Sequence, residues 1–170
     1  MNSHFLLEKL ENSEEYKKFI SENKDAYLCS GFFVIDLTEK NPENKFHFDF
    51  YVPSTKETFS FELENDMKKL KLERMDDVVL EKVSMKNNFD FDKLKEKILT
   101  EMEMKKITNK IQKMIFSLQN VDGKDILIGT IFLSGLGLIK ADIDLTENIF
   151  TEFEKSSLFD MMKIVKGKKN

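Results

Sequence analysis

Two stretches of the chain, residues 26–63 and 110–145, carry the same order of hydrophobic and polar positions. When the two stretches are aligned, three strand-like segments in each stay in register to within one residue. The aligned starting points are Phe33 with Ile115, Lys45 with Ile126, and Glu57 with Ile139. A pattern that recurs at a constant spacing is typical of a duplicated structural unit, so the repeat predicts the architecture before any other feature does.

Alternation of apolar and polar residues predicts half-buried strands in both stretches. In the first stretch, apolar side chains take every second position over residues 46–52 and again over residues 59–63. In the second stretch, residues 139–145 alternate in the same way. Turn-forming residues separate the segments at residues 41–44, 53–56 and 122–123. Alternating strands joined by short turns are typical of antiparallel meanders.

The first strand of each stretch differs from the others, because residues 31–35 and 114–116 are apolar on both faces. Such a strand is covered on both sides, or it lies where two sheets or two subunits meet. The sequence leaves open which of these arrangements the chain adopts.

A helical pattern precedes each group of strands. Asn12 or Ser13 is the predicted N-cap of the first helix, and Asp90 is the predicted N-cap of the second. The apolar stripes are Tyr16, Phe19 and Ile20 in the first helix, and Phe91, Leu94, Ile98 and Met102 in the second. Residues 3–10 predict an additional short helix at the start of the chain.

The charge of the chain argues against a nucleic-acid partner. The formal net charge is −4; residues 1–85 hold 12 basic and 18 acidic side chains (net −6), and residues 86–170 hold 15 and 13 (net +2). Neither half contains the basic stripe that binding to a phosphate backbone requires. With 41% hydrophobic and 34% charged residues, the composition is that of a globular protein with a polar exterior.

The sequence also predicts a cytoplasmic protein without a membrane partner. Its single cysteine, Cys29, cannot form an internal disulfide, which fits a reducing compartment. The first residues lack the cationic start and the apolar run of a signal peptide. The longest apolar stretches are too short and too interrupted to cross a bilayer.

Short motifs in the second stretch resemble PepSY-type domains, which have a cystatin-like fold. Residues 89–94 (FDFDKL) resemble the start of the helix in that family. Residues 142–149 (DIDLTENI) resemble its closing strand, with Glu147-Asn148 at the position of a left-handed turn. The whole chain is also similar to uncharacterised archaeal tandem PepSY-like proteins, through SEEYKKF, DAYLCSGFFVIDL and SLFDMM. The resemblance implies an association with the propeptides of peptidases and with the inhibition of peptidases.

Together, the patterns predict an α+β fold of two tandem cystatin/PepSY-like units, each a helix followed by a three- to four-stranded antiparallel meander. The first unit covers residues 1–70. The second covers residues 90–170 and includes an apolar C-terminal segment, and residues 71–89 connect the two. The arrangement of the two sheets and the structure of residues 65–89 stay open.

The side chains that could carry chemistry do not form a catalytic set. His47 and Asp49 share a strand face as an acid–base pair would, but a solvated sheet face explains them as well. The densest carboxylates, Asp76-Asp77 and Asp142-x-Asp144, lack the further oxygen donors of a calcium site. Cys29 lies on a strand, which favours a buried structural thiol. We therefore predict no enzyme activity, no cofactor and no metal site.

The C-terminal segment is the most suggestive feature for function, because it is too apolar for a terminal segment that makes no contacts. It packs back over the sheet or adds a strand, or else it is an exposed anchor for a partner or a second subunit. In the second case the candidate binding residues are Phe153, Leu158, Phe159 and Met162.

The favoured function is a non-enzymatic protein- or peptide-binding module. For the chain in general, the expected partner is a protein or peptide, or a second copy through self-association. One alternative is a small-molecule binder or enzyme with a pocket between helix and curved sheet, lined by His47, Asp49 and Tyr51. A second alternative is a structural homo-oligomer. The mass of the protein in solution separates this last case from the first.

Overall fold

A computed structural model describes residues 1–38, 40–64, 66–73 and 78–167 of the chain. This part contains eight strands in one sheet and four helices. The strands are β1 (Tyr27–Asp36), β2 (Lys45–Val52), β3 (Glu57–Glu62), β4 (Lys68–Leu72), β5 (Ile111–Val121), β6 (Lys124–Leu133), β7 (Gly137–Asp144) and β8 (Ile149–Ser157). The helices are α1 (Ser3–Glu11), α2 (Glu14–Glu22), α3 (Phe91–Met104) and α4 (Leu158–Gly167).

The prediction of two tandem helix-plus-meander units is wrong, because the chain forms one antiparallel sheet. Its strand order is β4-β3-β2-β1-β5-β6-β7-β8. At the centre, Gly31–Asp36 of β1 pair with Lys113–Leu118 of β5. The two strands that are apolar on both faces therefore meet, and each satisfies the backbone groups that the other would leave unpaired at a sheet edge. The two expected meanders are thus halves of one continuous hydrogen-bonded ladder.

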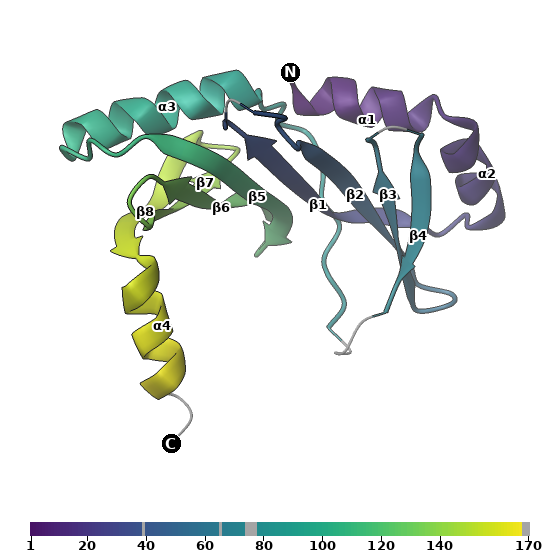
Figure 1. Ribbon diagram of the computed structural model, residues 1–170. Helices are drawn as coiled ribbons and strands as arrows, with labels where there is room; N and C mark the ends of the chain where they lie inside the picture. Colours follow the sequence, from purple (N-terminus) through teal and green to yellow (C-terminus); the bar gives the residue numbers. More distant parts are fainter. Residues whose placement is uncertain (39, 65, 74–77, 168–170) are drawn as a thin grey trace.

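Three helices cover one face of this sheet. In Figure 1, α1 and α2 lie over the half that contains β2, β3 and β4, and α3 lies over the half that contains β5 to β8. A single hydrophobic core lies between these helices and the sheet. Its largest fully buried side chains include Phe19, Phe33, Phe48, Phe61, Phe116, Ile98 and Met114. The many phenylalanines of the sequence thus fill one core that spans the whole sheet, since Phe adds buried area without a polar group that needs a partner.

Helices α2 and α3 begin where their sequences predict. The side chain of Ser13 accepts a hydrogen bond from the backbone amide of Tyr16 at the start of α2. At the start of α3, the side chain of Asp90 accepts hydrogen bonds from the amides of Asp92 and Lys93. Both predicted N-caps are confirmed, and they satisfy backbone donors that would otherwise lack a partner. The predicted apolar stripe of α3 is confirmed as its buried face: Phe91, Leu94, Ile98 and Met102.

An extended segment, residues 78–89, leads from the β4 side of the sheet to α3, and a buried carboxylate fixes its position. Asp125, at the start of β6, is 3% exposed. It accepts hydrogen bonds from the Ser84 hydroxyl at 2.6 Å and from the Met85 amide at 3.0 Å. The amide of Val83 donates to the carbonyl of Leu28 at 2.9 Å. These contacts tie the connecting segment to both halves of the sheet.

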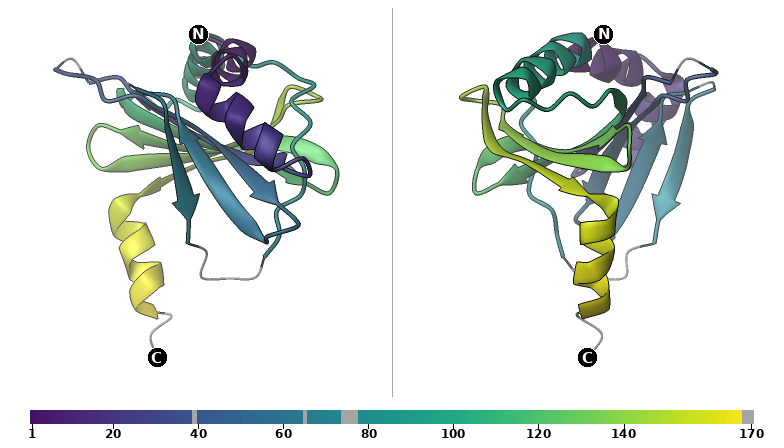
Figure 2. Two further views of the ribbon diagram at one scale, coloured as in Figure 1. Left: turned by 90° about the vertical axis from the view of Figure 1, so that its right-hand side faces the viewer. Right: turned by 60° about the vertical axis from the view of Figure 1, so that its left-hand side comes forward.

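The fourth helix lies apart from the other three. Figure 2 shows α4 leaving the body on the side of the sheet away from α1, α2 and α3. Within the apolar C-terminal segment, residues 149–157 add a strand to the sheet, and the helix follows that strand. None of the helices in the described ranges has the length and apolar character needed to cross a membrane.

Replacing Phe33 with alanine tests whether the hydrophobic core lies on the helix-covered face of the sheet. Phe33 is fully buried and lies opposite Phe116 at the junction of β1 and β5. Truncation leaves a cavity, so we expect the Phe33→Ala variant to lose about 3–5 kcal/mol of unfolding free energy. Urea denaturation followed by circular dichroism measures this loss. The control is Phe32→Ala, whose side chain points to the opposite face and is 37% exposed, with an expected loss below about 1 kcal/mol. Similar losses for the two variants would contradict a core confined to the helix side.

Candidate functional site

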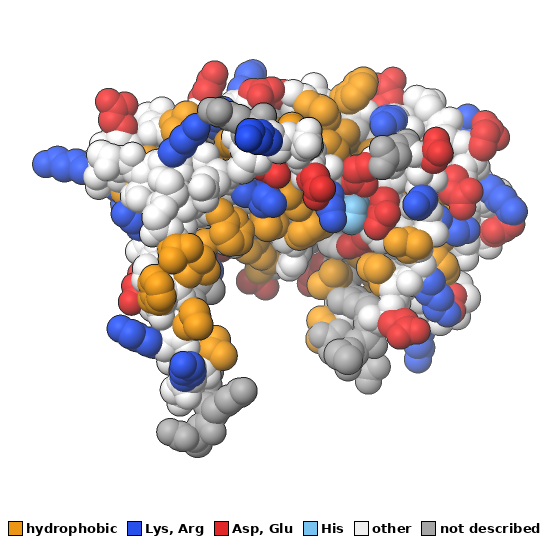
Figure 3. Space-filling model, viewed as in Figure 1, with side chains coloured by type: hydrophobic (Ala, Val, Ile, Leu, Met, Phe, Trp, Pro, Cys, Tyr) orange, Lys and Arg blue, Asp and Glu red, His pale blue; other side chains and the backbone are white. Residues whose placement is uncertain are grey.

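The sheet face that α1, α2 and α3 leave uncovered is apolar at its centre. Side chains alternate between the two faces of a strand, so the neighbours of buried Phe33 and Phe116 point to this open face. Figure 3 shows hydrophobic side chains gathered beneath the sheet and again along α4. The apolar residues of the face include Phe32 on β1, which is 37% exposed, and three half-buried residues: Ile115 on β5, and Ile128 and Phe132 on β6. Apolar surface gathered in this way is typical of a binding surface.

A shallow hollow lies at the edge of this face, where α4 leaves the sheet. It has a volume of about 320 Å³, and its lining is mostly apolar. Its walls come from β6, β7, β8 and the first turn of α4. The lining residues are Thr130, Leu138, Ile139, Lys140, Glu154, Ser156 and Asp160. The hollow therefore continues the open face to the base of α4.

The direction of α4 is set by the end of β8, because no linker separates the strand from the helix. The Ser157 hydroxyl accepts a hydrogen bond from the Asp160 amide at 3.1 Å and donates one to the Asp160 carboxylate at 2.8 Å. The Leu158 amide donates to the carbonyl of Leu136 at 3.0 Å. These bonds form an N-terminal cap and attach the first turn to the β6–β7 turn. The helix is thus held at its base.

The apolar side chains beyond this base are exposed. Phe159 is 60% exposed, Met162 56% and Val165 62%. Large apolar side chains that are more than half exposed on one helix are typical of a surface that binds a partner. Lys163 and Lys166 lie on the same helix and are also exposed.

The structure separates one of the four predicted binding residues from the other three. Leu158, Phe159 and Met162 lie together on α4. Phe153 lies on β8 and packs against the core on the helix-covered face, with its ring centroid 5.0 Å from that of Phe150. The ammonium group of Lys105 lies 5.9 Å from the centroid of the Phe153 ring. Strand alternation places Phe153 on the helix-covered face of the sheet. This assignment requires the register of β8 against its neighbouring strand, which the sequence alone did not provide.

A polar cluster occupies the other end of the open face. Nε2 of His47 lies 3.5 Å from Oε2 of Glu64 and 3.9 Å from Oε1 of Glu62. The three side chains are 19%, 22% and 32% exposed, in the order His47, Glu64, Glu62. They line a hollow of about 450 Å³ together with Pro42, Glu43, Asn44 and Lys45. Figure 3 shows a histidine beside acidic side chains in this part of the surface.

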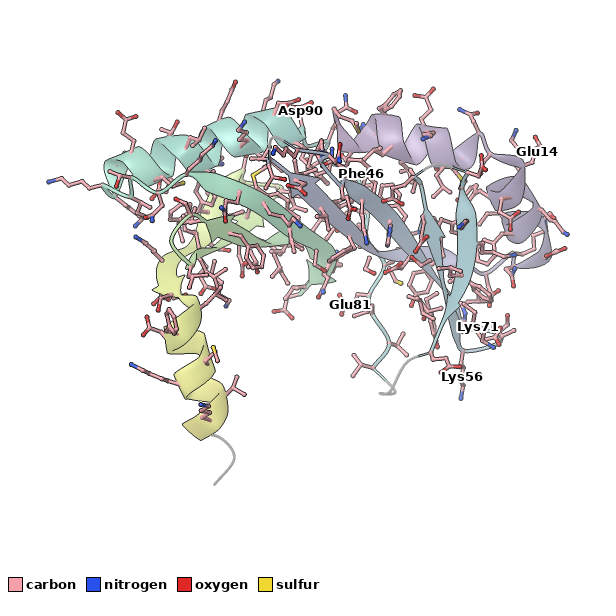
Figure 4. The ribbon with its side chains drawn as sticks, viewed as in Figure 1. Glu14, Phe46, Lys56, Lys71, Glu81 and Asp90 are labelled. Atoms are coloured by element: carbon pink, nitrogen blue, oxygen red, sulfur yellow. The ribbon has the colours of Figure 1, made fainter. Side chains whose placement is uncertain are left out.

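The backbone holds this cluster in place. His47 and Glu62 face one another in the register of β2 and β3. The Leu63 amide donates to the carbonyl of Phe46 at 2.9 Å, which extends the ladder by one residue beyond β3. The Phe46 amide also donates to Oε1 of Glu64, at the β2 position labelled in Figure 4. Glu64 is therefore held by the backbone hydrogen bond of its neighbour Leu63 and by its own carboxylate.

The three residues predicted to line a small-molecule pocket have separate partners. His47 faces Glu62 and Glu64, as described above. Asp49 accepts a hydrogen bond from the Ser30 hydroxyl at 2.7 Å. Tyr51 packs against Tyr27 with ring centroids 5.7 Å apart. The sequence pattern singled out His47 but missed both glutamates. The usable signal was the two-residue spacing of Glu62 and Glu64, because such a spacing places two side chains on the same side of an extended segment, and β3 forms a hairpin with β2.

The predicted turn and carboxylate features have structural roles. Asn148 has a φ of 53°, which confirms the left-handed turn expected there, and Gly135 has a φ of 73° in the turn between β6 and β7. Asp144 accepts a hydrogen bond from the Lys124 ammonium at 2.8 Å and another from the Thr146 amide at 2.8 Å. Its carboxylate oxygens are thus engaged within the fold. Asp76-Asp77 lie outside the described residues.

Comparisons with known proteins add a fold but no family. No protein-family model matches the chain, and no curated protein matches it significantly. The crystal structure of "a putative lipoprotein" from Clostridium difficile 630 is similar, with a TM-score of 0.50 and 12% sequence identity. The similarity covers 84% of this chain and 91% of the other. At this identity it supports the antiparallel-sheet fold alone. The resemblance to archaeal PepSY-like proteins and the cytoplasmic location stay predictions.

The ion pair of Asp144 predicts an acid-dependent part of the stability. The hydrogen bond from Lys124, followed by those from the Glu147 and Thr146 amides, lowers the pKa of the Asp144 carboxyl below its ordinary value. A carboxyl whose pKa is lowered in the folded state stabilises the fold above its unfolded pKa of about 3.9, and this contribution is lost as the pH falls through the folded value. We expect Asp144→Asn to lower the unfolding free energy at pH 7 and to have a smaller effect at pH 3.

Urea denaturation at the two pH values measures this difference. The matched control is Asp66→Asn, which neutralises an exposed aspartate and should change stability little at either pH. An equal loss at pH 7 and pH 3 for Asp144→Asn would mean that packing, not charge, accounts for the role of this residue.

Proposed function

We propose that the protein is a non-enzymatic protein-binding module that self-associates, with α4 of one copy bound to the open sheet face of a second copy. The observation that carries this proposal is the pair of unpartnered apolar surfaces on one side of the chain. Phe159, Met162 and Val165 are each more than half exposed on α4. The open face offers apolar side chains of β1, β5 and β6 beside it. Burial of these surfaces against each other removes both from water.

The base of α4 argues that the acceptor lies on another copy. Because β8 runs into α4 without a linker and the Ser157–Asp160 cap fixes the first turn, the helix is directed away from its own sheet. Folding the helix back onto the sheet of the same chain would break the hydrogen bond from the Leu158 amide to the Leu136 carbonyl. A second copy can approach α4 with no such cost.

The charges on the two surfaces are complementary. Lys163 and Lys166 flank the exposed apolar side chains of α4. The open face continues from β1 onto β2 and β3, which belong to the acidic N-terminal half of the chain. The chain as a whole has the same asymmetry, with a net charge of −6 in residues 1–85 and +2 in residues 86–170. A basic helix therefore suits the acidic half of another copy, and complementary charge favours the correct orientation.

The position of the surfaces fits a two-fold symmetric dimer. Helix α4 and the open face lie on the same side of the chain (Figure 2), so each copy provides both a helix and an acceptor surface. In a two-fold arrangement the same contact is made twice. The proposal gathers Leu158, Phe159 and Met162 into one interface and assigns Phe153 to the core of the monomer.

The mass of the protein in solution tests the proposal. We expect the wild-type chain to be a dimer at micromolar concentrations in sedimentation velocity. Phe159→Asp places a charge in the proposed interface, and it should convert the protein to a monomer because an unpaired charge is costly to bury. The matched control is Phe5→Asp on α1, at a side chain that is 57% exposed on the opposite side of the sheet. This variant should remain a dimer.

Two outcomes would contradict the proposal. One is a wild-type chain that remains a monomer at about 100 μM, roughly a hundredfold above micromolar affinity. The other is a dimer that Phe159→Asp leaves intact. Dissociation by both variants would place the interface elsewhere. Circular dichroism of each variant confirms that the fold is retained.

A further inference from the structure

We propose that His47, Glu62 and Glu64 form a binding site for one divalent transition-metal ion, with Zn²⁺ as the preferred ion. The three side chains offer one ligand atom each, and these atoms all lie within 4.8 Å of one another. The inference depends on the geometry of this cluster and is independent of self-association through α4.

The distances within the cluster are close to those of a tetrahedral centre. Zn²⁺ binds nitrogen and oxygen ligands at 2.0–2.2 Å, which places two ligand atoms about 3.3–3.5 Å apart. The separation between His47 Nε2 and Glu64 Oε2 is 3.5 Å, and that between His47 Nε2 and Glu62 Oε1 is 3.9 Å. The third separation, between the carboxylate oxygens of Glu62 and Glu64, is no more than 4.8 Å.

The chemistry of the three groups suits a transition metal better than calcium. One imidazole and two carboxylates form a donor set that zinc accepts, whereas Ca²⁺ requires six to eight oxygen ligands. Three protein ligands leave the fourth tetrahedral position to water, and the hollow of about 450 Å³ around the cluster has room for it. The site therefore has the composition of an open zinc centre.

The negative charge of the two carboxylates also favours a bound cation. Glu62 and Glu64 approach the same imidazole nitrogen, and within the described ranges neither forms an ion pair with a lysine or arginine. Lys45 lines the same hollow, but its ammonium group makes no ion pair with either carboxylate. Two carboxylates that share a partly covered position repel each other unless a positive charge lies between them. A bound metal ion supplies that charge.

The supporting contacts hold the ligands ready for binding. The Phe46 amide donates to Oε1 of Glu64, which leaves Oε2 directed at His47. The ring of His47 lies against Phe32, with ring centroids 6.0 Å apart. His47 and Glu62 are direct cross-strand neighbours on β2 and β3. Contacts of this kind orient metal ligands and raise affinity, because less freedom is lost on binding.

Isothermal titration calorimetry with Zn²⁺ alone tests the site in the full-length protein. We expect one ion per chain for the wild type. Glu64→Gln and His47→Gln should each weaken binding at least about 10-fold, since each removes one of three ligands. The matched control is His4→Gln, which removes the other histidine of the chain, bonded through Nε2 to the carbonyl of Met85 at 3.0 Å. This variant should bind Zn²⁺ as the wild type does.

A spectroscopic measurement gives a second, independent result. Co²⁺ bound in place of Zn²⁺ should give the intense visible absorption of a four-coordinate ion, and Glu62→Gln should remove it. Absence of Zn²⁺ binding to the wild type, or equal weakening by His4→Gln and His47→Gln, would overturn the inference. The monomeric Phe159→Asp variant should retain the site, so a failure of the dimer proposal and a failure of the metal proposal are distinguishable.

Discussion

The backbone pairing of β1 with β5 is the interaction on which the rest of the structure depends. Gly31–Asp36 and Lys113–Leu118 join the two halves of the chain into one ladder of eight strands. Without this pairing each half would have an exposed apolar edge strand, with unsatisfied backbone donors and acceptors. The junction also places Phe33 opposite Phe116, so that the core beneath α1 and α2 continues without a break into the core beneath α3.

Three helices lie on one side of the sheet, and the central strands on the other face are not covered by any helix of the described residues. On the covered face, the apolar side chains of the helices pack against fully buried phenylalanines of the sheet. On the other face the central strands still present apolar side chains, because β1 and β5 are apolar at successive positions. The fold thus produces an accessible apolar surface from the same strands that hold its two halves together, and α4 emerges beside that surface.

The two proposed activities occupy different regions of this open face. The apolar centre and α4 provide a surface for a protein partner, and the end near β2 and β3 carries a compact set of polar ligands. The polar set depends on rigid elements: His47 and Glu62 lie in paired strands, and the Phe46 amide restrains Glu64. Groups fixed in this way lose little entropy when they bind an ion, which a flexible surface cluster would not achieve.

The sequence by itself determined the local elements: alternation predicted the strands, and Ser13 and Asp90 marked the starts of two helices, because periodicity and capping depend on neighbouring residues. Only the tertiary structure decided that the two groups of strands join through β1 and β5. The β1–β5 junction turned two expected units into one sheet, and the β2–β3 register placed Glu62 against His47. It also assigned Phe153 to the covered face and Phe159 to solvent. The β1–β5 pairing and the exposure of these side chains depend on contacts between residues far apart in the chain, which a local pattern does not specify.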